Sequence, residues 1–197
     1  KVAGRHVLVV GGGEVAARRA ESLAAVGAVV RVVSLEFVPE LQQLQNVERI
    51  VAAYSPEMIG WAWLVFACVD DVQVNARVAE DALAAGVLCN AADDPDECDF
   101  FMPSVLRRGA LTLAVGTGGA SPALAARLRE GLESQFDFVW GILMEELQRA
   151  RDVVREQVHA IEDRRRIMKS LASAESVEQF RQNPQAWKSW LEQLVVN

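Results

Sequence analysis

The stretch "VVGGGEVAARRA", residues 9–20, joins a β-branched run to a helical pattern near the start of the chain. Gly11, Gly13 and Ala16 match the pattern G-x-G-x-x-A. In this pattern the first glycine permits a tight turn, the second lets the backbone approach a pyrophosphate, and the small third residue lets the helix pack closely. The free amides at the helix start attract anions. We therefore predict a dinucleotide-binding turn at Gly11, Gly12 and Gly13, the alternative being a tight turn without a ligand.

Around this turn, short β-branched runs alternate with longer helical patterns. The expected strands are 6–10, 29–33, 47–52, 63–69 and 87–90. Helical patterns fill the first and last of the intervals between them and end at Gly27 and Gly86. Because strands alternating with helices build parallel sheets covered on both faces, we predict an α/β, Rossmann-like domain.

The rhythm changes after Asn90, where "AADDPDECDFFMP" is acidic and contains two prolines, which predicts a loop. A further strand is expected at 110–115, followed by a second glycine-rich turn and a helix that begins near Pro122. From about residue 136 onward helix formers dominate. We therefore expect an all-helical domain at the C-terminal end.

Composition bounds the partners of the chain. The 197 residues are 51% hydrophobic and 24% charged, which predicts a folded globular protein. A net charge of −7 argues against nucleic acid as the main partner. The apolar runs are shorter than the roughly 20 residues that a membrane span needs, so we expect no membrane association and a cytoplasmic protein. The cysteines form no C-x-x-C pair, so no metal site is predicted, and Cys68 and Cys89 are expected to be packed thiols.

The second glycine turn, "VGTGGASP" at 115–122, repeats the order of strand, glycine loop and capped helix. Such a helix start suits a substrate carboxylate, which would be bound by Thr117, Gly118, Gly119 and Ser121. Ser121 before Pro122 is equally typical of a helix cap that binds nothing. Both interpretations remain open at this stage.

Acidic residues follow three of the expected strands. After the second strand, Ser34 replaces the usual acid, and Glu36 is the candidate acceptor for the ribose hydroxyls, which favours NAD over NADP, unless Glu36 is simply a solvated loop carboxylate. After the fifth strand, Asp93 and Asp94 lie where ligands bind in parallel sheets, and a carboxylate there is the candidate general base. Asp70 and Asp71 follow the fourth strand and are also expected to point towards the cofactor edge. For Asp71 a role at the helix N-terminus is the simpler explanation.

Several of these motifs together resemble a known family. "VLVVGGGEVAARRAESLAAVGA", "FACVDDVQVN", "NAADDP" and "FFMPSVLRRGALTLAVGTGGASPALAARLRE" are similar to the siroheme synthase dehydrogenase module, the precorrin-2 dehydrogenase (sirohydrochlorin ferrochelatase) family. The resemblance is dense from Val7 to Glu130, whereas the helical tail matches in length and character alone. Thr117 stands where many members carry serine, and it keeps the hydroxyl.

The resemblance implies an enzyme that oxidises precorrin-2 to sirohydrochlorin with NAD as hydride acceptor, and that in some members also inserts iron or another metal. It implies a homodimer with active sites between domains: an NAD-binding Rossmann domain at 1–102, a dimerisation region at 103–137 and a helical domain at 138–197. It assigns the essential carboxylate to Asp93. The NAD contacts that it implies are Glu14, Val15, Leu35 and Glu36.

Precorrin-2 carries eight carboxylates, so basic residues near the cleft are expected to help to bind it, and the candidates are Arg107, Arg108, Arg127 and Arg129. Two rival functions remain open. One is an NAD-sensing regulatory domain without catalysis, which leaves the second glycine turn and Asp93 without a role. The other is a ferrochelatase that retains the nucleotide fold as a relic.

Overall fold

The computed structural model describes residues 1–92 and 94–196, and for residues 95 and 194–196 it describes the backbone alone. The chain divides into two compact units, Lys1–Met102 and Pro103–Asn197. The predicted further division between residues 137 and 138 stays a prediction.

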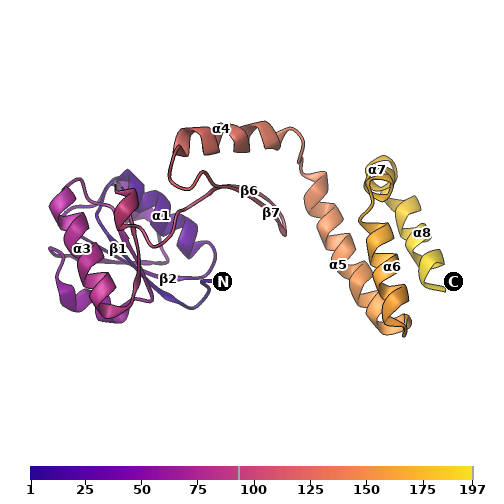
Figure 1. Cartoon of the computed structure of the whole chain (residues 1–197), viewed down its shortest axis with the longest axis horizontal. Coiled ribbons are helices and arrows are strands. Elements are labelled where there is room, and N and C mark those ends of the chain that lie inside the picture. The colour runs from indigo at the N-terminus through magenta and orange to yellow at the C-terminus, as the bar shows by residue number, and fades with distance from the viewer. Residues whose placement is uncertain (93, 197) are drawn as a thin grey trace. The chain divides into compact units, whose positions relative to one another are not determined.

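The first unit is a five-stranded parallel sheet in the order β3-β2-β1-β4-β5 (Figure 1). This arrangement confirms the predicted Rossmann-like fold. Its elements in chain order are β1 (His6–Val10), α1 (Glu14–Ala24), β2 (Val29–Ser34), α2 (Pro39–Gln43), β3 (Val47–Val51), the 3₁₀ helix η1 (Pro56–Trp61), β4 (Leu64–Ala67), α3 (Val72–Ala85), β5 (Leu88–Ala91) and the 3₁₀ turn η2 (Pro95–Glu97).

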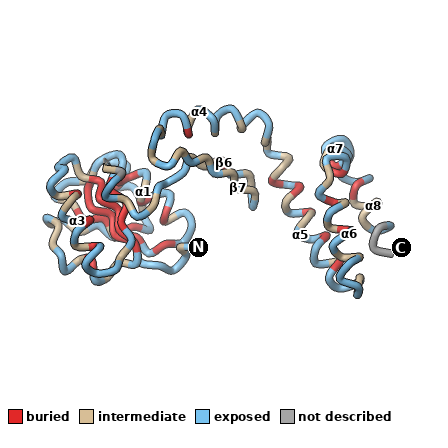
Figure 2. Tube along the Cα trace, viewed as in Figure 1, coloured by how far each residue is buried: buried red, intermediate tan, exposed pale blue. Residues whose placement is uncertain are grey.

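Side chains of β1 alternate between two hydrophobic cores because successive residues of a strand point to opposite faces. Val7 and Val9 pack with α1 and α2, whereas Leu8 and Val10 pack with η1 and α3. Both faces of the sheet are therefore covered, and Figure 2 shows its central strands as the buried part of this unit. Burial on both faces explains why the strand sequences are apolar runs instead of alternating patterns.

The second unit begins with a two-stranded antiparallel hairpin, β6 (Ser104–Arg108) and β7 (Leu111–Val115), against which α4 (Pro122–Glu133) packs. Gly109 turns the hairpin with a φ of +55°, a conformation that glycine adopts without strain. The rest of the unit is four helices: α5 (Val139–Gln157), α6 (Ile161–Leu171), α7 (Ala174–Gln182) and α8 (Pro184–Val196). The expected helical character of the C-terminal residues is therefore confirmed.

The four helices share a core of their own. It is centred on Trp187, whose indole nitrogen donates to the hydroxyl of Ser176 at 2.7 Å and whose ring meets Phe180 edge-on at 5.4 Å. Buried aliphatic residues of α5 and α6 complete the core. Satisfying the indole donor lets a large side chain be buried without an unpaired polar atom.

Some elements were not predicted. The sequence patterns indicated neither α2 nor η1, which are short and begin at prolines, nor β6, whose "SVLRR" contains two arginines in five residues. Such segments lack the apolar period that identifies longer elements.

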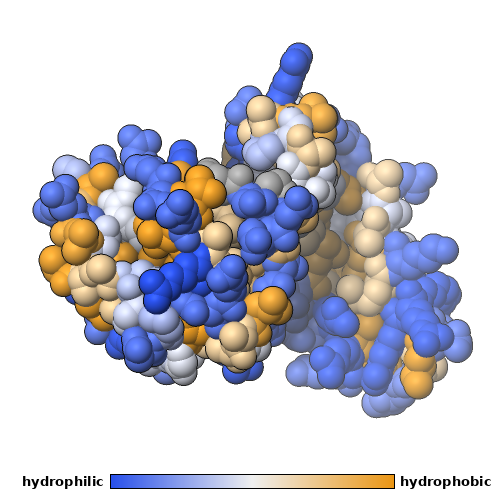
Figure 3. Space-filling view, turned by 60° about the vertical axis from the view of Figure 1, so that its left-hand side comes forward, coloured by the Kyte–Doolittle hydropathy of each residue, from blue (hydrophilic) through white to orange (hydrophobic). Residues whose placement is uncertain are grey.

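No helix within the described part of the chain is both long and apolar enough to cross a membrane. On the face shown in Figure 3, hydrophobic residues are interspersed with hydrophilic ones. Scattered apolar residues of this kind are usual on protein surfaces.

Candidate functional site

A cavity of about 390 Å³ opens beside the glycine turn of the first unit. It lies where β1 is flanked by β2 on one side and β4 on the other, so that connections on the two sides run in opposite directions. In open parallel sheets this topological switch point is where ligands bind. The residues that line the cavity are Gly12, Gly13, Ser34, Glu36, Phe37, Val38, Cys68, Val69 and Asp70.

Gly11 and Gly12 occupy positions that exclude any side chain. Gly11 has a φ of +126°, and a Cβ there would overlap the carbonyl oxygen of Cys68. A Cβ on Gly12 would overlap the carbonyl oxygen of Glu36 and lie 2.7 Å from the hydroxyl of Ser34. The turn is held by hydrogen bonds from Gly11 N to Val33 O and from Val38 N to Gly12 O, both 2.9 Å. These glycines therefore bring β1, β2 and β4 close together at the cavity floor.

Gly13 serves a different purpose. It is the N-cap of α1, with φ of −86°, and it offers no side chain to cap the first turn. A Cβ on Gly13 would meet nothing within 4 Å. The first amides of a helix have no intrahelical partner, so the amino end of α1 presents free N–H groups next to the cavity. This geometry suits a phosphate group.

The predicted cofactor residues are only partly brought together. Gly12, Gly13 and Glu36 line the cavity, whereas Gly11 is buried and is not among the described lining residues. Glu36 is exposed, and no described residue hydrogen-bonds its carboxylate. Leu35 is 68% exposed, and neither Leu35, Val15 nor Glu14 is among the described residues that line the cavity.

The carboxyl end of β4 forms a wall of the cavity, lined by Cys68, Val69 and Asp70, more than fifty residues from the glycine turn. Asp70 was expected at the cofactor edge, whereas the sequence patterns did not identify Cys68 and Val69 as part of the site. Asn75 of α3 is 4% exposed; its side-chain amide donates to Val69 O at 2.8 Å and its oxygen accepts from Val69 N at 3.2 Å. Asn75 thereby fixes the backbone of this wall. Ser34, Phe37 and Val38 were also missed as lining residues, although their place at the end of β2 or shortly after it was the signal for them.

Asp71 accepts hydrogen bonds from the amides of Gln73 and Val74 at 2.9 and 3.4 Å. It is the N-cap of α3, as predicted. Asp70, immediately before it, is exposed and lines the cavity. The two neighbouring carboxylates therefore differ in role.

In the second glycine turn, the hydroxyl of Thr117 accepts from the Ser121 amide and donates to the Ser121 carbonyl, both at 3.1 Å. Gly118 and Gly119 have φ of +61° and +84°, respectively. The Ser121 hydroxyl accepts from Leu124 N at 3.2 Å and caps α4. The loop is thus closed internally, and its role in substrate binding stays a prediction.

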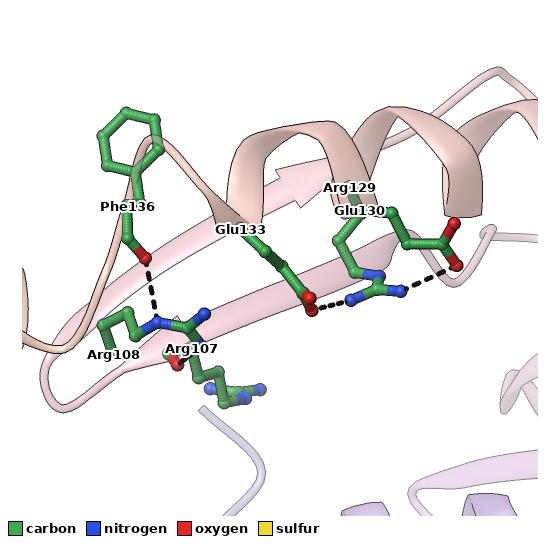
Figure 4. Close-up of polar contacts among 6 residues, drawn as sticks. All are labelled: Arg107, Arg108, Arg129, Glu130, Glu133 and Phe136. Atoms are coloured by element: carbon green, nitrogen blue, oxygen red, sulfur yellow. Dashed lines mark hydrogen bonds and ion pairs between the residues drawn. The ribbon is translucent and has the colours of Figure 1, made fainter.

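The four arginines suggested for substrate binding differ in their surroundings, and Figure 4 shows three of them, Arg107, Arg108 and Arg129. Arg108 donates to Phe136 O at 2.9 Å, and Arg129 is paired with Glu133 and Glu130 on its own helix. Arg107 has a long 3.5 Å contact with Thr112, and Arg127 is exposed with no partner among the described residues. Of the four arginines, Arg107 and Arg127 therefore make the fewest hydrogen bonds and ion pairs with described residues.

Asp93 lies outside the described residues. On either side of it, Ala92 N donates to Ala67 O at 2.9 Å, and the Asp94 carboxylate accepts from Asp96 N at 3.0 Å. The acidic loop therefore starts at the carboxyl edge of the sheet, next to the end of β4.

The cysteines match their predicted packing. Cys68 and Cys89 are buried, and burial raises the pKa of Cys89 to about 12, so its thiol is protonated at neutral pH. Among the described residues no three His, Cys, Asp or Glu side chains gather as a metal site.

Comparisons with known proteins match both parts of the chain. Residues 1–104 match the family described as putative NAD(P)-binding, and residues 108–135 match the central region of sirohaem biosynthesis proteins. Siroheme synthase 1 of Pectobacterium atrosepticum is 38% identical over 170 residues, which cover 85% of this chain and 35% of that protein. Siroheme synthase 2 of Aeromonas salmonicida is 36% identical over 194 residues, which cover 97% of this chain and 40% of that protein.

The chain thus spans somewhat over a third of the length of these relatives. The solved structure of SirC, a precorrin-2 dehydrogenase, superposes with a TM-score of 0.80 at 23% identity and covers all of this chain and 96% of its own. That likeness concerns the fold. The glycine turn, the cavity at the switch point and the match over residues 1–104 agree, and the chain belongs to the putative NAD(P)-binding family.

Proposed function

We propose that the protein is an NAD-dependent dehydrogenase that oxidises precorrin-2 to sirohydrochlorin. The observation that carries this proposal is the combination, in one chain, of a nucleotide cavity at the switch point with the central region of sirohaem biosynthesis proteins. The names of the siroheme synthases and of the SirC structure support the same substrate class.

The cofactor that we propose is NAD and not NADP. Glu36 lines the cavity beyond the end of β2, where a carboxylate can accept hydrogen bonds from ribose hydroxyls and would repel a 2′-phosphate. No arginine or lysine is among the described residues that line this cavity. The first-turn amides of α1, preceded by Gly13, would hold the pyrophosphate.

Asp93 is the proposed general base. Oxidation of precorrin-2 transfers a hydride to the nicotinamide and releases a proton, so the reaction needs one group to accept that proton. Asp93 follows Ala92, which is anchored to the carboxyl end of β4 beside the cavity. The same carboxylate could accept the pyrrole protons that leave when a divalent metal, as substrate, enters sirohydrochlorin.

The proposed quaternary structure is a homodimer formed through residues 103–137. Within this fully described stretch, Leu106 and Ala125 are the only buried residues. Leu124 and Leu128 of α4 are 49% and 50% exposed. A hairpin with one helix buries too little apolar surface to be stable by itself, so a second copy of the same surface is the partner that would cover it.

The substrate carboxylates would meet the second glycine turn and the uncommitted guanidinium groups of Arg107 and Arg127. An acidic tetrapyrrole needs several positive or N–H-rich contacts in a chain whose net charge is −7. The cap made by Ser121 and the inward bonds of Thr117 keep this loop in one conformation.

The test is an anaerobic incubation of the purified protein with precorrin-2 and NAD, followed by the absorption spectrum of sirohydrochlorin. We expect sirohydrochlorin with NAD and none without it, and much slower formation with NADP. Asp93→Ala should abolish turnover while the dissociation constant of NAD stays within about twofold, and Asp96→Ala, three residues along the same loop, is the matched control.

Turnover that is unimpaired in Asp93→Ala would refute the assignment of the base. NAD binding without any oxidation would instead favour a nucleotide-sensing domain. Ferrous or cobaltous ion added after the oxidation tests metal insertion, by the rate of metallation against a protein-free control.

A further inference from the structure

A small hydrogen-bonded cluster joins the two ends of the acidic loop that follows β5. Its members are Asn90 on the strand, Cys98 just after η2, and Asp99 and Phe100 beyond. Asn90 is 6% exposed, and both hydrogens of its amide nitrogen are used: one reaches Phe100 O at 2.8 Å and the other Cys98 Sγ at 3.4 Å. A buried amide with these partners holds residues 98–100 beside the strand.

The thiol of Cys98 faces the loop. Its sulfur lies 3.1 Å from Ala91 O, at the end of β5, and 3.2 Å from Asp94 O, within the loop. One S–H is shared between these two carbonyls while the sulfur accepts from Asn90. The thiol thereby connects the end of the strand, the middle of the loop and the chain that leaves it.

Two hydrogen bonds to the backbone of Cys89 also hold Asp99 beside β5. Asp99 N donates to Cys89 O at 2.9 Å, and the Asp99 carboxylate accepts from Cys89 N at 2.8 Å. These bonds place Asp99 beside Cys89 of β5. The Cys98 thiol adds contacts to Ala91 and Asp94.

The protonation state of the thiol suits this role. Burial raises the pKa of Cys98 above its usual value, so the S–H donor is present throughout the neutral range. A protonated, partly buried thiol is a poor nucleophile, and the arrangement is therefore that of a structural donor.

We propose that Cys98 is a positioning residue for the oxidation, which with Asn90 holds Asp94 to Ala91 at the carboxyl edge of the sheet. The proposal rests on the proposed function because Asp93, the suggested base, lies between these two residues in the sequence. A base displaced by about 1 Å can cost on the order of 100-fold in rate, so a loosened loop should lower kcat and leave nucleotide binding unchanged.

The experiment compares three variants of the full chain. Cys98→Ala removes donor and acceptor, Cys98→Ser keeps both on a smaller atom, and Cys89→Ala removes a buried thiol whose side chain makes no hydrogen bond among the described residues. We expect kcat to fall about 10- to 100-fold in Cys98→Ala, with the NAD dissociation constant within about twofold. Cys98→Ser should recover most of the rate, and Cys89→Ala should remain within about threefold of the parent.

Amide hydrogen exchange of Ala92, Asp94 and residues 96–98 provides a readout that does not depend on turnover. Exchange there should be faster in Cys98→Ala than in the parent and Cys89→Ala, and slow again in Cys98→Ser. Equal kcat in Cys98→Ala and Cys89→Ala would overturn the proposal. If the parent protein failed to oxidise precorrin-2, the proposed function would be refuted. Independently of that result, unchanged exchange in Cys98→Ala would refute the positioning role of Cys98.

Discussion

At the scale of single residues, alanine at two adjacent glycines of the first turn should have different effects on stability. Gly12→Ala places a Cβ against the carbonyl of Glu36, so the turn must shift; we expect the melting temperature to fall and NAD binding to be lost. Gly13→Ala meets no protein atom within 4 Å, so the fold should keep its stability. Its methyl group would still occupy the approach to the pyrophosphate, and we expect NAD affinity to drop about tenfold or more.

Thermal melting and calorimetric titration with NAD separate these effects. Gly60→Ala is the control, because its Cβ also meets nothing and the residue lies in η1, away from the cavity. If Gly13→Ala bound NAD as tightly as the parent, the pyrophosphate would not lie at this turn.

One substitution at Ser121 distinguishes a helix-capping role of this residue from a role in substrate binding. Ser121→Asp keeps an oxygen that can cap α4, so the free energy of unfolding should stay within about 0.5 kcal/mol. An added carboxylate would repel an acidic tetrapyrrole, and we expect KM for precorrin-2 to rise about tenfold with NAD affinity unchanged. Ser173→Asp, at the cap of α7, is the matched control. An unchanged KM in Ser121→Asp would leave the cap as the role of this serine.

At the scale of elements, one ion pair couples the start of α5 to α7. Arg181 donates to both carboxylate oxygens of Asp137, at 3.2 and 2.7 Å, and these bonds hold the pKa of Asp137 below its usual value. A carboxyl group whose pKa is lower in the folded than in the unfolded protein stabilises the fold. This stabilisation is complete above the unfolded-state pKa, about 3.9 for Asp, and is lost as the pH falls through the folded-state pKa.

We therefore expect Arg181→Met to be less stable than the parent at pH 6 and to approach it as the pH falls below the unfolded value of about 3.9. Urea unfolding at pH 6, 4.5 and 3 measures the difference. Arg166→Met, which removes a surface pair within α6, should change stability little at any of these pH values. A gap between Arg181→Met and the parent that did not narrow in acid would show that the pair contributes by packing alone.

At the scale of the whole molecule, the exposed apolar side chains of α4 predict the oligomeric state. Leu128→Glu places a charge in the surface assigned to the partner copy, so we expect light scattering to give the mass of one chain where the parent gives two. Leu83→Glu is the control, because Leu83 is 77% exposed on α3 in the other unit. A parent protein of single-chain mass would exclude the proposed homodimer.

Much of the fold was predictable because local signals carry it. The five strands and the helices α1 and α3 follow from apolar runs, the stops at Gly27 and Gly86, and the cap at Asp71. Gly11 and Gly13 were identifiable from the G-x-G-x-x-A pattern, and the structure shows that Gly11 and Gly12 admit no side chain. The wall of the cavity at the end of β4 was predicted only at Asp70. Cys68 and Val69 have no local pattern, since they become part of the site only when β4 pairs with β1.

The sequence by itself therefore determined the parallel sheet, the nucleotide turn and the caps, because periodicity, glycine and capping residues act over a few neighbouring positions. The tertiary structure alone decided which strands meet at the switch point, that Asn75 fixes the wall of the cavity, and that Cys98 joins both ends of the acidic loop. Those contacts connect residues through space, and no short stretch of the chain encodes them. Their physical basis is burial, which leaves each polar atom to find its partner wherever the fold brings one.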